Sequence, residues 1–242
     1  MDTLSALARR IRALPPSCGP VRLVAVDGHA GSGKTTFATR LAAALGGAPV
    51  LHTDDFATHE ELFAWAGRLR GQVLEPLARG GTARYAAYDW VARRFADEVR
   101  ELRPAPVILI EGVGSGRRAL RPYLALLLWM ELPADASWAR GELRDGPGLS
   151  DFWEGWRRAE WAHFADDPSL PYADARVRQV RRTPEPAEAP EPPAEPVEPV
   201  EPSGAEGSTG SEGTEGPESP EGPMEQARQE AYEVLEGRAV DR

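Results

Sequence analysis

Along the first 182 residues, short, mainly apolar and β-rich runs alternate with longer segments in which apolar residues recur every three or four positions. Strands without internal alternation are buried on both faces, as parallel strands covered by helices are. The runs therefore predict strands of a parallel sheet. They lie at residues 21–26, 107–110 and 124–130, with shorter or weaker strand patterns at 49–52 and 175–180.

Helical spacing fills the intervals between these strands, as expected when each strand is connected to the next through a helix. The predicted helical segments are residues 3–14, 34–45, 60–101 (mostly helical, with a break at Gly80-Gly81), 135–145 and 150–166. The chain is therefore predicted to form a doubly wound α/β domain, in which helices cover both faces of the sheet.

The composition changes after residue 182. Residues 183–223 contain 11 Pro and 11 Glu but no aromatic residue, so they have almost nothing to bury. An extended, disordered linker is expected there. Residues 224–242 regain apolar side chains and are predicted to form a short C-terminal helix. The proposed division is a domain over 1–182, a linker over 183–223 and a helix over 224–242.

Charge follows the same division. The chain has 28 basic and 38 acidic residues, and its net charge of −10 divides into +3 for residues 1–182 and −13 for the remainder. A nearly neutral domain argues against nucleic acid as a partner. No apolar run approaches the ~20 residues of a membrane helix, which argues against a membrane. Cys18 is the only cysteine, which is typical of a reducing compartment, so a cytoplasmic protein is predicted.

The strongest motif follows the first strand and satisfies the Walker A pattern G-x-x-x-x-G-K-[ST]. Its glycines let backbone N–H groups surround phosphate oxygens, while the lysine reaches the terminal phosphates and the hydroxyl holds Mg²⁺. Lys34 is the only lysine among the 28 basic residues. The predicted nucleotide-binding set is Gly28, His29, Ala30, Gly31, Ser32, Gly33, Lys34, Thr35 and Thr36.

Carboxylates follow two other strands. Asp54 and Asp55 come directly after the strand at 49–52, and Glu111 ends the strand at 107–110. The carboxyl ends of parallel strands face the ligand crevice. One aspartate of the pair is a candidate to accept the proton of an attacking hydroxyl or to hold Mg²⁺; the alternative is that it caps the following helix. A charge at the position of Glu111 is costly unless it meets a cation or a metal.

Arg140 and Arg144 lie four residues apart on one face of the predicted helix at 135–145. Like charges at this spacing cost a few tenths of a kcal/mol when they are unpaired. An anionic partner such as a phosphate is one explanation, and a solvated helix face is the other.

These elements, in this order, resemble the uridine kinase and phosphoribulokinase-like branch of the P-loop kinases. Residues 27–36 match the family's D-G-x-x-G-S-G-K-[ST]-T loop, 54–56 its Asp-x-Phe element, 111–112 its Glu-Gly strand end and 135–145 its D-x(4)-R-x(3)-R-D lid. Residues 84–90 look like its acceptor-side Y-D-[FW] motif. The resemblance extends over roughly residues 20–180.

The resemblance implies the P-loop NTPase fold and an ATP- and Mg²⁺-dependent transfer of a phosphoryl group to a hydroxyl of a nucleoside-like small molecule. Asp54 would be the catalytic base, with Lys34, Arg140 and Arg144 acting on the phosphates. The metal would be held by Thr35, Asp54 and Glu111. The acceptor would be bound by Asp55, Tyr88, Asp89 and Arg93.

Two positions depart from this family. Ala57 stands where a tyrosine is common, and Arg93 stands where uridine kinases have a base-contacting histidine. The acceptor therefore stays open, with another small alcohol, such as a sugar or a vitamin precursor, as an alternative. A nucleotide-binding regulator or NTPase without an acceptor is the rival from another class. Tyr88 and Trp90 have core packing as their alternative role, and the sequence does not define the oligomeric state.

Overall fold

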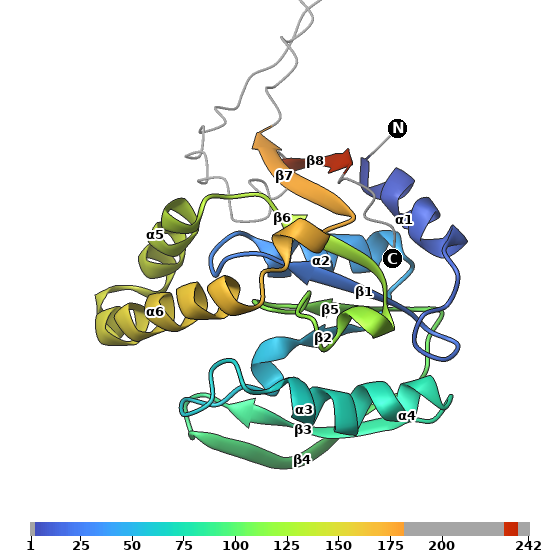
Figure 1. Ribbon diagram of the computed structural model, residues 1–242, viewed down its shortest axis with the longest axis horizontal. Coiled ribbons are helices and arrows are strands. Elements are labelled where there is room, and N and C mark those ends of the chain that lie inside the picture. Colours follow the sequence, from blue (N-terminus) through green and yellow to red (C-terminus); the bar gives the residue numbers. More distant parts are fainter. Residues whose placement is uncertain (1–2, 182–229, 237–242) are drawn as a thin grey trace, which may run out of the picture. The chain divides into compact units, whose positions relative to one another are not determined.

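The computed structural model describes residues 3–181 and 230–236 (Figure 1). Its main sheet has six strands in the order β2-β5-β1-β6-β7-β8. The strands are β1 (Arg22–Asp27), β2 (Val50–His52), β5 (Val107–Glu111), β6 (Leu124–Met130), β7 (Ala175–Arg181) and β8 (Glu230–Glu236). The pairs β2–β5, β5–β1, β1–β6 and β6–β7 are all parallel, so the predicted parallel sheet is confirmed.

The helices lie where apolar spacing predicts them in most of the chain. They are α1 (Thr3–Ala13), α2 (Lys34–Ala44), α3 (Ala66–Leu69), a π-helical turn (Arg70–Leu74), α4 (Glu75–Ala78), α5 (Ala134–Asp145) and α6 (Ser150–Asp166). The turn joins α3 to α4 in one helical segment (Figure 1). Leu7 and Ile11 are buried, so α1 packs on the domain.

The two faces of the sheet carry separate apolar cores. In β1, Leu23 and Ala25 pack in the core that includes Leu69 and Leu74 of the α3–α4 segment. Val24 and its neighbour Val26 point the opposite way, into the core formed with α1 and α2. Alternate side chains of one strand therefore serve opposite faces, and the predicted doubly wound arrangement is confirmed.

Residues 83–102 correct the helical prediction for 60–101. They form an antiparallel hairpin of β3 (Ala83–Asp89) and β4 (Arg94–Leu102). In β3 the buried residues Ala83, Tyr85 and Ala87 alternate with less buried ones. A register shift between Ala86 and Tyr88 interrupts this alternation, and β4 is exposed along most of its length. Its charged surface therefore has no apolar period that would identify a strand.

The described part of the C-terminal segment also corrects a prediction, because residues 230–236 form strand β8 rather than a helix. Tyr232 is buried and its ring lies 4.9 Å from that of Phe37 on α2, with Val234 packed against the same core. Residues two apart share a face in a strand, so the core favours this conformation. The predicted linker at 183–223 lies outside the described residues, and the domain boundaries stay predictions.

Within residues 3–181 and 230–236, none of the helices is both long enough and apolar enough to span a membrane.

His163 on α6 provides a test of this packing. Its ring stacks on Phe63 at 4.7 Å, and burial together with the positive charge of Arg117 lowers the pKa of His163 to about 4. In an unfolded chain its pKa is about 6.5, so below about pH 6.5 the unfolded state binds a proton that the folded state excludes. The free energy of unfolding should therefore decrease as pH falls from about 6.5 to about 4, by at most about 1.4 kcal/mol per pH unit.

His163→Phe keeps an aromatic ring and removes this titration. We expect its melting temperature to fall less than that of the wild type between about pH 7 and about pH 5. Equal pH dependence of the two proteins in thermal unfolding would contradict the assignment.

Candidate active site

The phosphate loop connects β1 to α2 and is pressed against α5. Gly31 and Gly33 have positive φ angles of 83° and 93°. A Cβ atom on Gly31 would overlap the backbone carbonyl of Ser137 and come within 2.9 Å of the backbone nitrogen of Gly141. Only glycine fits at this contact. The loop therefore approaches α5 at backbone distance and ends at the N-terminus of α2, where backbone N–H groups are available to an anion.

Lys34 and Thr35 open helix α2 at the inner end of this loop. The Lys34 side chain is only 7% exposed, and its Nζ donates a hydrogen bond of 2.8 Å to the carbonyl of His29. Thr35 Oγ1 donates to Glu111 Oε1 at 3.1 Å, so the predicted loop hydroxyl and strand-end carboxylate do meet. Thr36 follows, exposed, in the first turn of α2.

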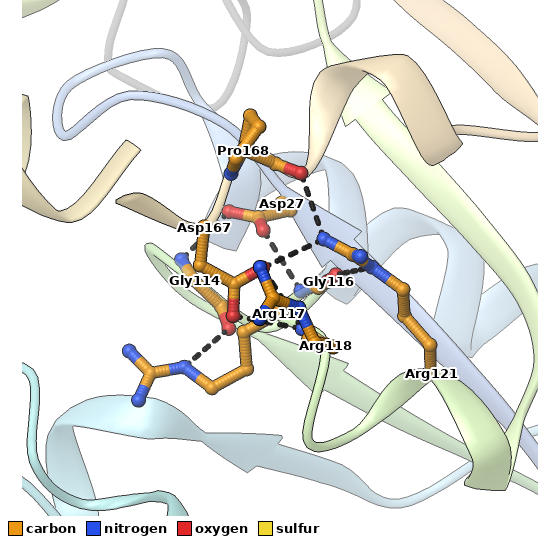
Figure 2. Close-up of polar contacts among 8 residues, drawn as sticks. All are labelled: Asp27, Gly114, Gly116, Arg117, Arg118, Arg121, Asp167 and Pro168. Carbon is orange, nitrogen blue, oxygen red and sulfur yellow. Dashed lines mark hydrogen bonds and ion pairs between the residues drawn. The ribbon is translucent and has the colours of Figure 1, made fainter. Parts of the chain in front are cut away.

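Asp27 joins the start of the loop to the segment that follows Glu111. Its buried carboxylate accepts a hydrogen bond from the backbone N–H of Gly28 at 2.7 Å. It also accepts from the backbone N–H groups of Gly114 and Gly116, each at 2.8 Å (Figure 2). Burial raises the pKa of Asp27, while these N–H donors act in the opposite direction. The ends of β1 and β5 are therefore held in a fixed relation, and with them the phosphate loop and Glu111.

Arg117 extends this connection toward the segment that follows the two aspartates. Its Nε donates to the carbonyl of Gly114 at 3.1 Å and its Nη1 to the carbonyl of Phe63 at 2.6 Å. The guanidinium also lies 4.1 Å from the ring centroid of Trp65. Nearby, Arg121 is paired with Asp167 at 2.8 Å (Figure 2). The loop after β5 is therefore connected both to the end of β1, through Asp27, and to the segment that contains Phe63 and Trp65.

The environment of Glu111 fits a magnesium ion. Its Oε1 atom bonds His52 Nδ1 at 2.6 Å as well as the hydroxyl of Thr35, and the His52 contact raises the pKa of that imidazole. Hydroxyl and carboxylate oxygens are the ligands that Mg²⁺ prefers, and it commonly uses only one or two carboxylates together with phosphate oxygens and water. The described residues contain no cluster of three His, Cys, Asp or Glu arranged around a metal position.

Asp54 and Asp55 differ sharply although they are neighbours in the turn after β2. Both oxygens of Asp55 are bound by Arg100 of β4, at 3.1 and 3.0 Å. The Asp54 carboxylate has no hydrogen-bond or ion-pair partner within the part of the chain that the structure describes. Partial desolvation and then the charge of Glu111 raise the pKa of Asp54, against the opposing charge of Lys34. Asp54 is therefore the aspartate available for proton transfer.

A group of aromatic side chains lies beside the turn that carries Asp54. Trp90 donates its indole N–H to the carbonyl of Asp54 at 3.2 Å. Its ring lies 4.9 Å from His59, 5.3 Å from Tyr88 and 6.3 Å from Phe152 of α6. Tyr88 is buried, and its hydroxyl lies 3.0 Å from His59 Nδ1. We call His59, Tyr88, Trp90 and Phe152 the aromatic wall.

The other two residues predicted to bind the acceptor lie at the turn between β3 and β4. Asp89 accepts the backbone N–H groups of Val91 and Ala92 at 2.9 and 2.8 Å, which is the bonding of an aspartate that closes a turn. Arg93 is paired with Glu60 at 3.5 Å, and both side chains are exposed. The structure therefore gives each a local partner and does not bring their charged groups together.

The predicted lid arginines are on α5. Arg140 Nη1 donates to Gln179 Oε1 at 3.4 Å, next to the phosphate loop. Arg144 makes two hydrogen bonds to Asp145, at 2.6 and 2.9 Å. These bonds raise the pKa of Arg144, and the charge of Asp54 contributes in the same direction, so Arg144 belongs to the same electrostatic environment as Asp54.

Several site residues escaped the sequence interpretation, among them His52, Arg100, Arg117 and Glu160. Of these, Glu160 left a readable signal. It follows Trp153 and Trp156 at helical spacing, so an acidic residue stands on the apolar face of α6. A carboxylate in that position needs buried donors.

The strand order, with the phosphate loop leaving the central strand β1, is that of the P-loop NTPase fold. No protein-family model and no curated protein matches the chain.

The solved structures that are similar to it include the following three. A possible uridine kinase from Bacillus stearothermophilus is 20% identical, over 62% of this chain and 89% of that one, with a TM-score of 0.48. A protein named a fructose transport system kinase, from a Silicibacter species, is 25% identical, over 70% and 91%, with a TM-score of 0.49. D-glycerate 3-kinase from Cryptococcus neoformans var. grubii is 14% identical, over 74% and 92%, with a TM-score of 0.48.

Proposed function

We propose that this protein is an ATP- and Mg²⁺-dependent kinase that phosphorylates a hydroxyl of a small molecule bearing an aromatic ring, such as a nucleoside. The observation that carries the proposal is the state of Asp54. Its carboxylate is partnerless within the described residues, close to the charges of Lys34 and Glu111, while Asp55 is held by Arg100. A raised pKa brings a carboxylate nearer to the range in which general bases work.

In the proposed reaction, the loop N–H groups and Lys34 hold the phosphates, and Asp54 accepts the proton of the acceptor hydroxyl. Thr35 and Glu111 are the residues placed to hold Mg²⁺, which when bound neutralises charge on the phosphate oxygens. Arg144 leaves Asp145 to approach the transferred group. Positioning and electrostatic stabilisation then provide nearly all of the rate enhancement, as is usual in phosphoryl transfer.

The aromatic wall supports a ring-bearing acceptor over a sugar or a glycerate. The Trp90 indole is tied to the backbone of Asp54 by its hydrogen bond to the Asp54 carbonyl. Its partners His59 and Phe152 are themselves only partly buried, so ring surface is available to a ligand. A nucleobase stacked on such a surface places the attached sugar hydroxyls near Asp54.

The experiment that tests this function measures ADP formation by the full-length protein with Mg²⁺ and a panel of acceptors that includes nucleosides, simple sugars and glycerate. We expect nucleosides to stimulate turnover and to yield a phosphomonoester, detected by mass spectrometry. Hydrolysis of ATP at the same rate without any acceptor would instead identify an NTPase. Stimulation by sugars or glycerate alone would leave the kinase standing and refute the ring-bearing acceptor.

Replacing Trp90 with alanine tests the aromatic wall. Stacking of one base on an aromatic side chain contributes about 1–3 kcal/mol, so the KM for the acceptor should rise by roughly 5- to 150-fold. The KM for ATP should stay within about twofold, because Trp90 does not contact the phosphate loop. Trp161→Ala is the matched control, since Trp161 is 69% exposed on α6. An unchanged acceptor KM in W90A would exclude stacking.

A further inference from the structure

Glu160 is a fully buried carboxylate in the middle of α6, at 0% exposure, and it faces the phosphate loop. Its Oε1 lies 2.7 Å from Nδ1 of His29. Its Oε2 accepts the backbone N–H of Ala30 at 3.2 Å and the indole N–H of Trp156 at 2.7 Å. Two of the three partners thus belong to the first half of the phosphate loop, and α6 is bonded directly to it.

The His29 side chain is inserted into an aromatic pocket on the same side. Its ring makes edge-on contacts with Trp129 at 5.4 Å, Trp138 at 5.9 Å and Phe164 at 5.2 Å. The same residue offers its backbone carbonyl to the ammonium of Lys34. Glu160 is therefore bonded to His29, whose backbone carbonyl accepts the hydrogen bond from Lys34, and so helps to fix the position of that carbonyl.

A buried negative charge beside a phosphate-binding loop is costly in two ways. It loses its hydration, and it repels the phosphates that the loop is expected to bind. Burial acts to raise its pKa, but the hydrogen bond from His29 and the charge of Lys34 hold the pKa of Glu160 below its usual value. Attraction of ATP therefore does not explain why a carboxylate stands at this position. Its three hydrogen-bond partners do explain it, if its role is to fix the positions of those partners.

The same helix is bonded to the predicted lid. Trp153 donates its indole N–H to Asp145 at 3.2 Å, and Arg157 donates to Glu142 at 2.7 Å. Gly141 of α5 faces the ring of Trp153 so closely that a side chain there would overlap it. Helices α5 and α6 are therefore packed as one unit, and Glu160 is the link between this unit and the phosphate loop.

We propose that Glu160 is a positioning residue for nucleotide binding: it fixes the first half of the phosphate loop through His29 and Ala30, so that the loop N–H groups and Lys34 are arranged before the phosphates arrive. The inference rests on the proposed function, because it takes the nucleotide to bind at this loop. Preorganisation lowers the cost of binding, so losing it should weaken nucleotide affinity more than it weakens the fold.

The test is Glu160→Gln in the full chain, with ADP and Mg²⁺ as the probe in titration calorimetry. Glutamine keeps the volume but removes the negative charge, and its amide nitrogen cannot accept the hydrogen bonds that a carboxylate oxygen receives. Loss of a hydrogen bond to a charged group corresponds to about a tenfold to hundredfold increase in the Kd for ADP. Glu154→Gln is the matched control, because Glu154 lies on the same helix with its side chain 74% exposed. Its Kd should stay within about twofold of the wild type.

Two further readouts separate positioning from simple destabilisation. In nuclear magnetic resonance spectra, ADP should shift the indole N–H signal of Trp156 in the wild type, with Trp156→Phe identifying that signal. This response should be lost in E160Q. The His29→Ala and E160Q changes should also be non-additive in the Kd for ADP, because both break the same contact.

Lys34→Ala distinguishes the failure of this inference from failure of the proposed function. If K34A abolishes ADP binding while E160Q leaves the Kd unchanged, Glu160 has no positioning role and the proposed nucleotide site survives. If K34A binds ADP as well as the wild type does, the nucleotide site itself is wrong. An E160Q protein that loses affinity only in proportion to a fall in its folded fraction, measured by circular dichroism, would also overturn the inference.

Discussion

Lys34→Ala is expected to reduce kcat for phosphoryl transfer by about 10²- to 10³-fold, the scale on which removal of one preorganised donor to developing charge acts. In the absence of nucleotide the ammonium contacts only the His29 carbonyl within the loop, so the melting temperature should change by no more than a few degrees. Steady-state kinetics and thermal unfolding of the same preparation check the two halves of this result.

Lys34→Arg is the informative companion to that variant. It keeps the charge, but a planar guanidinium is larger than an ammonium and needs a different geometry, and Lys34 is only 7% exposed. We expect K34R to remain far below wild-type activity. Near-normal kcat in K34A would refute the role of the loop lysine, and full activity in K34R would show that charge alone suffices.

Asp54→Asn is expected to reduce kcat by about 10²- to 10⁴-fold, because it keeps the shape of the side chain and removes the general base. The Kd for ADP should change little, since the loop N–H groups and Lys34 are untouched. Single-turnover measurements with saturating ATP separate the loss in the chemical step from any loss in binding.

Asp55→Asn is the control, and it should act differently. Both Asp55 oxygens are bound by Arg100, so this change weakens the attachment of the β3–β4 hairpin and should raise the acceptor KM more than it lowers kcat. If D55N instead loses kcat by the factor expected for D54N, the assignment of the base within the pair is reversed.

The parts of the fold that the sequence predicts well are those in which local pattern and burial agree. The run at 21–26, the glycines of the loop and the helix after Lys34 each indicate their own conformation, and in β1 every residue after Arg22 is buried, as the apolar pattern predicts. The family resemblance implies that Thr35 and Glu111 act on one metal, and their side chains lie 3.1 Å apart.

The hairpin and β8 show where such prediction fails. Strand β4 is mostly solvent-exposed, so its conformation comes from pairing with β3 and leaves no apolar period in the sequence. In β8, Tyr232 and Val234 are two residues apart, and a short apolar set of this kind fits either a strand or one turn of a helix. The choice is made by the ring of Phe37, almost 200 positions earlier in the chain.

Within the site, the motifs predicted residues for the ligands and passed over the residues that are bonded to them. His52, Arg100 and Glu160 act on Glu111, Asp55 and His29 respectively, and each pair is separated by 45 or more positions. Such contacts depend on how helices and strands pack. A single sequence carries them only indirectly, as in the acidic residue among the tryptophans of α6.

The tight contact at Gly31 bears on which side of the proposed site moves when a ligand binds. Helix α5 contacts the loop backbone at Gly31 so closely that a methyl group would not fit. Helix α6 is hydrogen-bonded to the loop through Glu160. The side of the site formed by α5 and α6 is therefore held to the loop at two places. A kinase must exclude water from its site before phosphoryl transfer, so the proposed function requires some part of this site to close. The part that moves is then expected to be the tip of the β3–β4 hairpin, where Val91 is 95% exposed. Trp90, next to Val91, is the residue proposed to stack on the acceptor. Binding of the acceptor, rather than of the nucleotide, is therefore expected to close the site.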